Sequence, residues 1–235
     1  MARRRDGRPS HTLRPMTIRA LLFDLDGTLI DSLPEIGGAM NDVLQQLGHP
    51  LHSLSDYRFL VGQGLVRLVE RALPAERLDQ LDEACVLFRE IYTARACSSQ
   101  LYEGIAELLE GASALGLPMA VCSNKPHAMT EQVAAERLAG FSWAGIEGER
   151  AGRPPKPDPA AALDLAERIG VAPAEVAFVG DTKTDMQTGV NAGMVPVGVL
   201  WGFRDRAELE SHGAQVVVSR PDELLDWLRA AGESR

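Results

Sequence analysis

The chain has 235 residues, of which 45% are hydrophobic, and this is enough apolar material for the buried core of a globular protein. Its formal net charge of -9 at pH 7 argues against a nucleic-acid partner, because phosphate backbones attract basic surfaces. No apolar run approaches the roughly 20 residues that cross a bilayer, and the three cysteines have no metal-type spacing. We therefore expect a cytoplasmic protein with reduced thiols and no membrane partner.

The first segment, residues 1–15, is basic and polar and contains proline. It lacks the apolar stretch of a secretory signal. We expect a disordered tail there, with the folded chain beginning near Met16.

Short apolar runs recur along the chain and indicate buried strands. The first, residues 18–23, stops at Asp24, and later runs lie at 119–122, 141–146, 176–179, 195–200 and 215–218. Amphipathic helical patterns separate the runs, and strands that alternate with helices predict a parallel sheet with helices on both faces. We expect an α/β core of the Rossmann-like, doubly wound type over residues 16–32 and 101–235.

The region 33–100 interrupts this alternation, because it shows helical periodicity and no convincing strand. Its three apolar stripes begin at Ile36, Leu65 and Leu81. The pattern predicts a small bundle of helices inserted after the first strand, and we assign residues 33–100 to it.

Two pairs of acidic residues follow predicted strands. Asp24 and Asp26 come directly after the first strand, and Asp181 and Asp185 follow the run at 176–179. Ligands of open parallel sheets bind beyond the carboxyl ends of the strands, and four acids gathered there would repel one another unless a cation neutralised them. The pattern favours a Mg²⁺ site, because hard cations prefer oxygen ligands. The alternative is that both pairs are solvated turns that cap helices.

Anion-binding groups accompany the acids. Ser123 and Asn124 end the run at 119–122 and offer a hydroxyl and an amide that can donate to phosphate oxygens. Lys156 precedes an expected helix start, which is a favourable place for an anion. The alternative for Lys156 is a solvated loop lysine.

These motifs together resemble a known family. Asp24-x-Asp26-Gly27-Thr28, Ser123-Asn124, Lys156-Pro157-Asp158-Pro159 and Gly180-Asp181-Thr182-x-x-Asp185 are similar to the four motifs of haloacid dehalogenase superfamily phosphatases, in the same order. The helical insert resembles the cap of that family. Three further stretches, at 61–64, 101–105 and 197–202, look most like those of phosphoglycolate phosphatases.

The resemblance implies a phosphatase that works through an aspartyl phosphate, with Asp24 as nucleophile and Asp26 as general acid and base. It implies Mg²⁺ between Asp24, the main-chain carbonyl of Asp26 and Asp181, with Asp185 close by. Ser123 and Lys156 would bind the phosphoryl oxygens.

Further residues are assigned to substrate binding. They are Thr28 and Asn124 in the motifs, and Arg67 and Arg71, which lie one helical turn apart in the cap and could meet a substrate carboxylate. The alternative for the two arginines is a solvated helix face.

The favoured substrate is a small phosphate monoester, with 2-phosphoglycolate as first candidate, acted on by a monomer or homodimer. A phosphosugar phosphatase or mutase of the same fold is the second hypothesis, and a non-catalytic binding protein is the third. A dehalogenase fits poorly, because members of that branch have no acid at the position of Asp26.

Overall fold

The computed structural model describes residues 17–95 and 98–232, so the tail predicted at 1–15 lies outside the described residues. Six parallel strands form one sheet in the order β5-β4-β1-β6-β7-β8. Their bounds are β1 Ala20–Phe23, β4 Met119–Pro126, β5 Trp143–Glu149, β6 Val176–Gly180, β7 Val195–Val199 and β8 Val216–Val218. After β1 the chain adds β4 and then β5 on one side of β1. It then crosses to the other side of β1 and adds β6, β7 and β8. The strand order thus reverses around β1, which is where such sheets bind ligands.

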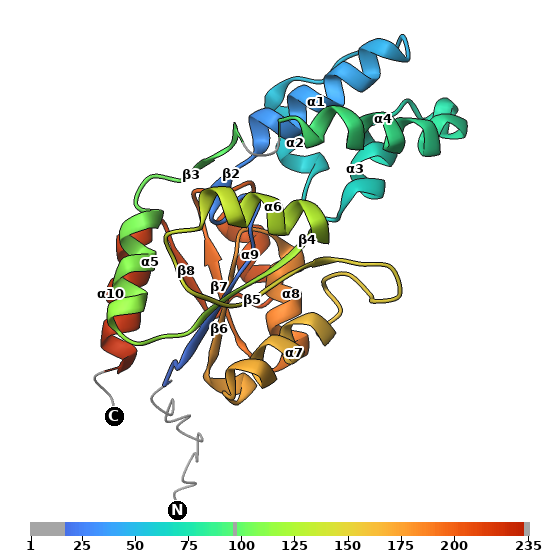
Figure 1. The fold of residues 1–235 in the computed structure, drawn as a ribbon. Coiled ribbons are helices and arrows are strands. Elements are labelled where there is room, and N and C mark those ends of the chain that lie inside the picture. The colour runs from blue at the N-terminus through green and yellow to red at the C-terminus, as the bar shows by residue number, and fades with distance from the viewer. Residues whose placement is uncertain (1–16, 96–97, 233–235) are drawn as a thin grey trace, which may run out of the picture.

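Both faces of the sheet are covered, because successive side chains of each strand point to opposite sides. Leu21 and Phe23 of β1 belong to the apolar core beneath α5 (Ile105–Ala114), α6 (His127–Arg137) and α10 (Pro221–Gly232). Ala20 and Leu22 belong to the opposite core beneath α7 (Ala160–Ile169) and α8 (Lys183–Ala192). The short helix α9 (Arg206–Ser211) packs beside β7 and β8. Figure 1 shows α5 and α10 together on one flank of the sheet and α7 and α8 on the other. The expected doubly wound parallel sheet is confirmed.

The expected helical insert is also present. It contains α1 (Leu33–Gln46), α2 (Leu54–Leu60), α3 (Leu65–Ala72), the 3₁₀ turn Ala75–Gln80 and α4 (Leu81–Thr93). These helices form the separate lobe above the sheet in Figure 1. Met40, Val43 and Leu44 of α1 are fully buried in it, and Tyr57 of α2 packs there while its hydroxyl donates to Asn41. We call this lobe the cap.

A two-stranded antiparallel ribbon joins the cap to the sheet domain. It pairs β2 (Ile30–Asp31) with β3 (Gln100–Leu101), the segments at which the chain enters and leaves the cap. The sequence did not predict these strands, because two residues are too few to show periodicity. The domain boundaries at 32/33 and 100/101 stay a prediction.

Within the described residues, no helix is both long and apolar enough to cross a membrane.

The central position of β1 generates a stability prediction. Leu22 is fully buried between β4 and β6, so Leu22→Ala should lower the free energy of unfolding by about 2–5 kcal/mol, the cost of a large-to-small change in a packed core. Urea unfolding followed by circular dichroism measures this. Leu163→Ala, at an exposed position of α7, is the control and should change little. Equal small effects of both changes would show that the β1 core is not tightly packed.

Candidate active site

Three carboxylates meet at the carboxyl ends of β1 and β6. Asp24 follows β1, and its amide donates to the carbonyl of Val179 at 2.9 Å, which aligns the ends of the two strands. Asp181 follows β6, and Asp185 lies in the first turn of α8. The three are buried, and each offers an oxygen within 4.8 Å of those of the other two. The convergence expected from the two acidic pairs is therefore found for these three residues.

Neighbouring groups hold Asp181 and Asp185 rigidly. Asp181 accepts hydrogen bonds from the Thr28 hydroxyl at 3.0 Å and from the Phe203 amide at 2.8 Å. Asp185 accepts from the amide and the hydroxyl of Thr182 at 2.9 and 2.7 Å, in the capping box that begins α8. The hydroxyl of Thr28, which is fully buried, positions Asp181, and the substrate-binding role predicted for Thr28 stays a prediction.

Lys156 lies among the acids. Its Nζ is 2.9 Å from Asp24 Oδ1 and 2.7 Å from Asp185 Oδ1, and its side chain is only 2% exposed. Asn124 fixes the main chain of Lys156, since its amide donates to the Lys156 carbonyl at 3.0 Å and its oxygen accepts from the Lys156 amide at 2.8 Å. The substrate-binding role predicted for Asn124 stays a prediction, but its position beside the lysine loop gives it a clear positioning role.

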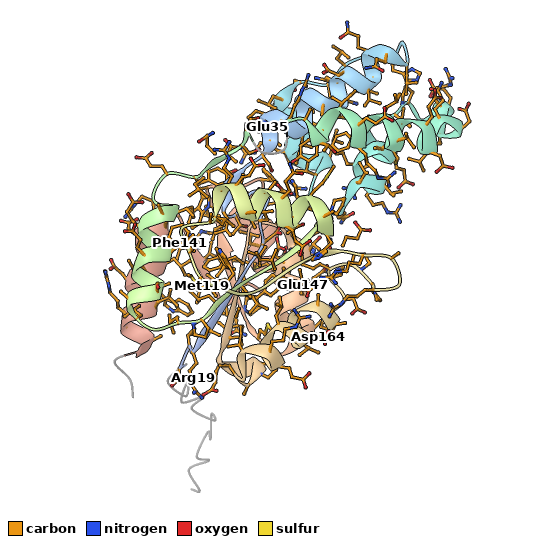
Figure 2. All side chains as sticks on the ribbon, viewed as in Figure 1. Arg19, Glu35, Met119, Phe141, Glu147 and Asp164 are labelled. Carbon is orange, nitrogen blue, oxygen red and sulfur yellow. The ribbon has the colours of Figure 1, made fainter. Side chains whose placement is uncertain are left out.

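A buried acid on β5 anchors the loop that carries Lys156. Glu147 is 2% exposed and pairs with Arg150, Arg153 and Arg168, while Arg153 also bonds Asp164 of α7. Glu147 and Asp164 are labelled in Figure 2, on the strand and the helix that flank the loop. These pairs tie both ends of the loop to the core, so Lys156 is presented on a rigid support.

The electrostatics of the cluster favour a cation. Burial first, and then the charge of Asp185, raises the pKa of Asp24 to about 7. Burial and the same neighbouring charge raise the pKa of Asp181 well above its usual value. Burial acts to lower the pKa of Lys156, but the charges of Asp185 and Asp24 outweigh it and raise the pKa, so Lys156 stays charged. One lysine cannot neutralise three acids, so this oxygen-rich, acidic cluster fits a divalent cation such as Mg²⁺.

Asp26 lies apart from the three clustered acids, in a pocket between the cap and the sheet domain. The pocket is also lined by Asp24, Ser123 and Asn124. Lys125 contacts both carboxylate oxygens of Asp26, at 2.9 and 3.0 Å. The metal role predicted for Asp26 stays a prediction, while its side chain lines the pocket together with its partner Lys125.

Lys125 was missed from the sequence, although it stands directly beside Ser123 and Asn124 at the end of a predicted strand. Burial acts to lower its pKa, but the charge of Asp26 and then Tyr92 outweigh burial and raise the pKa. Lys125 therefore remains an ammonium ion.

The structure does not bring the two cap arginines into this pocket. Arg67 pairs with Glu70 on an exposed face of α3, and Arg71 bonds the side chain of Gln63. Neither lines the pocket, whereas the turn containing Gly62 and Gly64 does. Substrate binding by Arg67 and Arg71 stays a prediction, and their placement corresponds to the solvated helix face.

The raised pKa values generate a stability prediction for protein freed of metal by a chelator. The folded state keeps protons on Asp24 that the unfolded chain releases near its usual pKa of 3.8, so stability should fall as pH rises toward about 7. Between pH 5 and pH 8 the loss should be about 2–3 kcal/mol, since each pKa unit is worth about 1.4 kcal/mol. Urea unfolding in EDTA measures it.

Two controls accompany this measurement. Asp24→Asn should make the fall shallower without removing it, because the pKa of Asp181 is raised as well. Mg²⁺ should stabilise the wild type more at pH 8 than at pH 5, because it binds the ionised form. A stability of the chelated protein that rises from pH 5 to pH 8 would contradict the account.

Comparison with known proteins identifies the family of the chain. A family model described as haloacid dehalogenase-like hydrolase matches residues 18–193. A phosphoglycolate phosphatase from Pseudomonas putida is 34% identical over 219 residues, which cover 90% of this chain and 78% of the relative. A solved haloacid dehalogenase-like family protein from Streptococcus pneumoniae is 27% identical, with a TM-score of 0.81 over 89% of this chain and 98% of its own. A HAD family hydrolase from Deinococcus radiodurans, solved with bound phosphate and sodium, is 25% identical, with a TM-score of 0.76 over 92% and 97%. The chain belongs to the haloacid dehalogenase-like hydrolase family.

Proposed function

We propose that the protein is a Mg²⁺-dependent phosphatase that hydrolyses a small organic phosphate monoester, with 2-phosphoglycolate as first candidate. The observation that carries the proposal is the position of Asp24, at a strand end between Lys156 and two further acids and on the wall of the pocket that also holds Asp26. The Pseudomonas putida relative is a phosphoglycolate phosphatase, and the Deinococcus radiodurans hydrolase was solved with bound phosphate. Both support an activity on phosphate esters.

The reaction has two transfers, both made at Asp24. A carboxylate oxygen of Asp24 attacks phosphorus, the bond from phosphorus to the ester oxygen breaks, and Asp26 donates a proton to the departing alkoxide. Asp26 then takes a proton from water, which attacks the aspartyl phosphate and releases inorganic phosphate. Asp26 is suited to both steps because it lines the same pocket and is two residues from the nucleophile.

The remaining groups stabilise charge. Ser123 lines the pocket and can donate its hydroxyl to a phosphoryl oxygen. Lys156 holds Asp24 in place and offers positive charge beside the phosphoryl group. Asp24, Asp181 and Asp185 would hold Mg²⁺, which supplies Lewis-acid neutralisation that lets two anions approach each other.

A sugar phosphate is the weaker alternative, whether hydrolysed or rearranged. Beyond the acids and Lys125, the pocket is lined mainly by apolar side chains, including Ile36, Leu65, Leu68 and Phe88. A sugar has several hydroxyl groups that need partners, and burying them against apolar walls is costly. This lining favours a compact substrate.

The proposal also covers the cellular location, the kind of partner and the oligomeric state of the enzyme. The buried free thiols of Cys85 and Cys122 support a reducing, cytoplasmic location, and Cys97 lies outside the described residues. The net charge of -9 supports a small-molecule substrate rather than a nucleic acid. We propose a monomer or homodimer whose cap, residues 33–100, moves as a unit over the pocket.

The nucleophile is tested by Asp24→Asn, which should fold normally and lose activity by several orders of magnitude, because an amide cannot form the acyl phosphate. Phosphate release from 2-phosphoglycolate and p-nitrophenyl phosphate, with and without Mg²⁺, is the assay. Asp226→Asn, on the exposed side of α10, is the matched control and should keep full activity. Near wild-type turnover by Asp24→Asn, or full activity in excess chelator, would overturn the proposal.

A further inference from the structure

The pocket between the cap and the sheet domain has an uneven charge distribution. The acids Asp24 and Asp26 line it, and most of its other lining residues are apolar side chains from both lobes. Among the described residues that line it, Lys125 is the only one with a positive charge. Lys156 approaches Asp24 from within the core and does not line the pocket. A substrate with a second negative charge, away from its phosphate, therefore finds one cation here.

Lys125 is held at the junction of the two lobes. It extends from β4 in the sheet domain, and its Nζ donates to the hydroxyl of Tyr92 in α4 of the cap at 2.6 Å. The same Nζ lies 4.7 Å from the centre of the Tyr92 ring, and that ring stacks on Phe88 with centroids 5.1 Å apart. Cap and core thus fix the ammonium group together.

Tyr92 supplies a second donor at this point. Its hydroxyl oxygen accepts from Lys125, and no described residue accepts the hydroxyl hydrogen. Tyr92 is only 2% exposed and lines the pocket, so the hydrogen can be satisfied by a bound ligand. An ammonium ion and a phenol that lie 2.6 Å apart make a suitable pair of donors for a carboxylate.

We propose that Lys125 and Tyr92 bind an anionic group on the alcohol part of the substrate and thereby select its class. This inference rests on the phosphatase function proposed above. Asp26 must reach the ester oxygen in order to protonate it, and Lys125 touches Asp26. A carboxylate one carbon from the ester oxygen then falls beside Lys125. The class is therefore monoesters of 2-hydroxy acids, of which 2-phosphoglycolate is the smallest.

The pairing of Lys125 with Asp26 fits this role. A buried ammonium ion needs a counter-charge, and in the free enzyme Asp26 provides it. A substrate carboxylate can share or replace that contact, whereas a neutral alcohol cannot. The gain in binding is therefore specific to the anionic substrate, and it is made next to the reacting bond, where it also orients the ester.

The experiment compares two substrates that differ in one group, 2-phosphoglycolate and ethyl phosphate. The readout is kcat/KM for 2-phosphoglycolate divided by kcat/KM for ethyl phosphate, both measured in Mg²⁺. This ratio cancels effects on the chemistry that the two substrates share. Lys125→Met should lower this ratio about 10- to 100-fold, the range that a hydrogen bond to a charged group supports. Tyr92→Phe should lower it several-fold, and Lys125→Arg should retain part of the preference because the charge remains.

Arg77→Met, at an exposed position of the 3₁₀ turn in the cap, is the control and should leave the ratio unchanged, because Arg77 does not line the pocket. Arg67→Ala and Arg71→Ala test the alternative that the cap arginines bind the substrate carboxylate. An unchanged ratio in Lys125→Met, with both activities lowered equally, would overturn the inference and leave Lys125 as a support for Asp26. A ratio lowered only by the cap arginines would also overturn it. If Lys125→Met does not fold, Tyr92→Phe decides in the same way.

The two proposals fail differently. If wild-type protein hydrolyses neither ester nor p-nitrophenyl phosphate in Mg²⁺, the phosphatase function itself is wrong. If it hydrolyses ethyl phosphate with the same kcat/KM as 2-phosphoglycolate, the phosphatase function stands and the anion-binding role of Lys125 and Tyr92 is wrong.

Discussion

Mutual repulsion among Asp24, Asp181 and Asp185 is the constraint around which the rest of the site is built. Their oxygens lie within 4.8 Å of one another in a buried position, with one lysine between them. The surrounding structure fixes all three acids with hydrogen-bond donors: a backbone amide bonds Asp24, and backbone amides and threonine hydroxyls bond Asp181 and Asp185. Gly27 and Gly202 contribute by lacking side chains, since a Cβ at either would lie 2.4 Å from an atom of Asp181. A cluster held at such cost is suited to binding a cation and little else.

The loop after β7 connects this cluster to the cap. The Phe203 amide donates to Asp181, while the carbonyl of Gly202 accepts from Arg58 of α2 at 2.7 Å. Arg204 also contacts the cap, by donating to the carbonyl of Val61 at 3.0 Å. The segment 202–204 thus contacts both Asp181, a proposed metal ligand, and two residues of the cap. The cap movement proposed above would therefore act on the proposed metal site as well as on access of water to Asp24.

Much of the site could be predicted because it depends on strand ends. Asp24 and Asp181 follow apolar runs, and parallel strands bring such residues to one edge of a sheet. The partnership of Lys125 with Tyr92 could not be predicted in this way, since it joins two lobes through the fold of the cap. The same limit applies to Arg67 and Arg71: helical spacing places them on one face of α3, but only the packing of α3 shows that neither lines the pocket. The hydroxyl of Thr28 likewise has its partner 153 residues away.

A covalent bond between phosphorus and Asp24 is the central feature of the proposed mechanism. Rapid mixing of excess enzyme with 2-phosphoglycolate and Mg²⁺, acid quenching within one turnover and reduction with borohydride would mark an acyl phosphate for mass spectrometry. The proposed mechanism predicts that Asp24 is reduced to homoserine and that no other carboxylate is. Modification of a different residue, or release of phosphate before the quench with no residue modified, would contradict it.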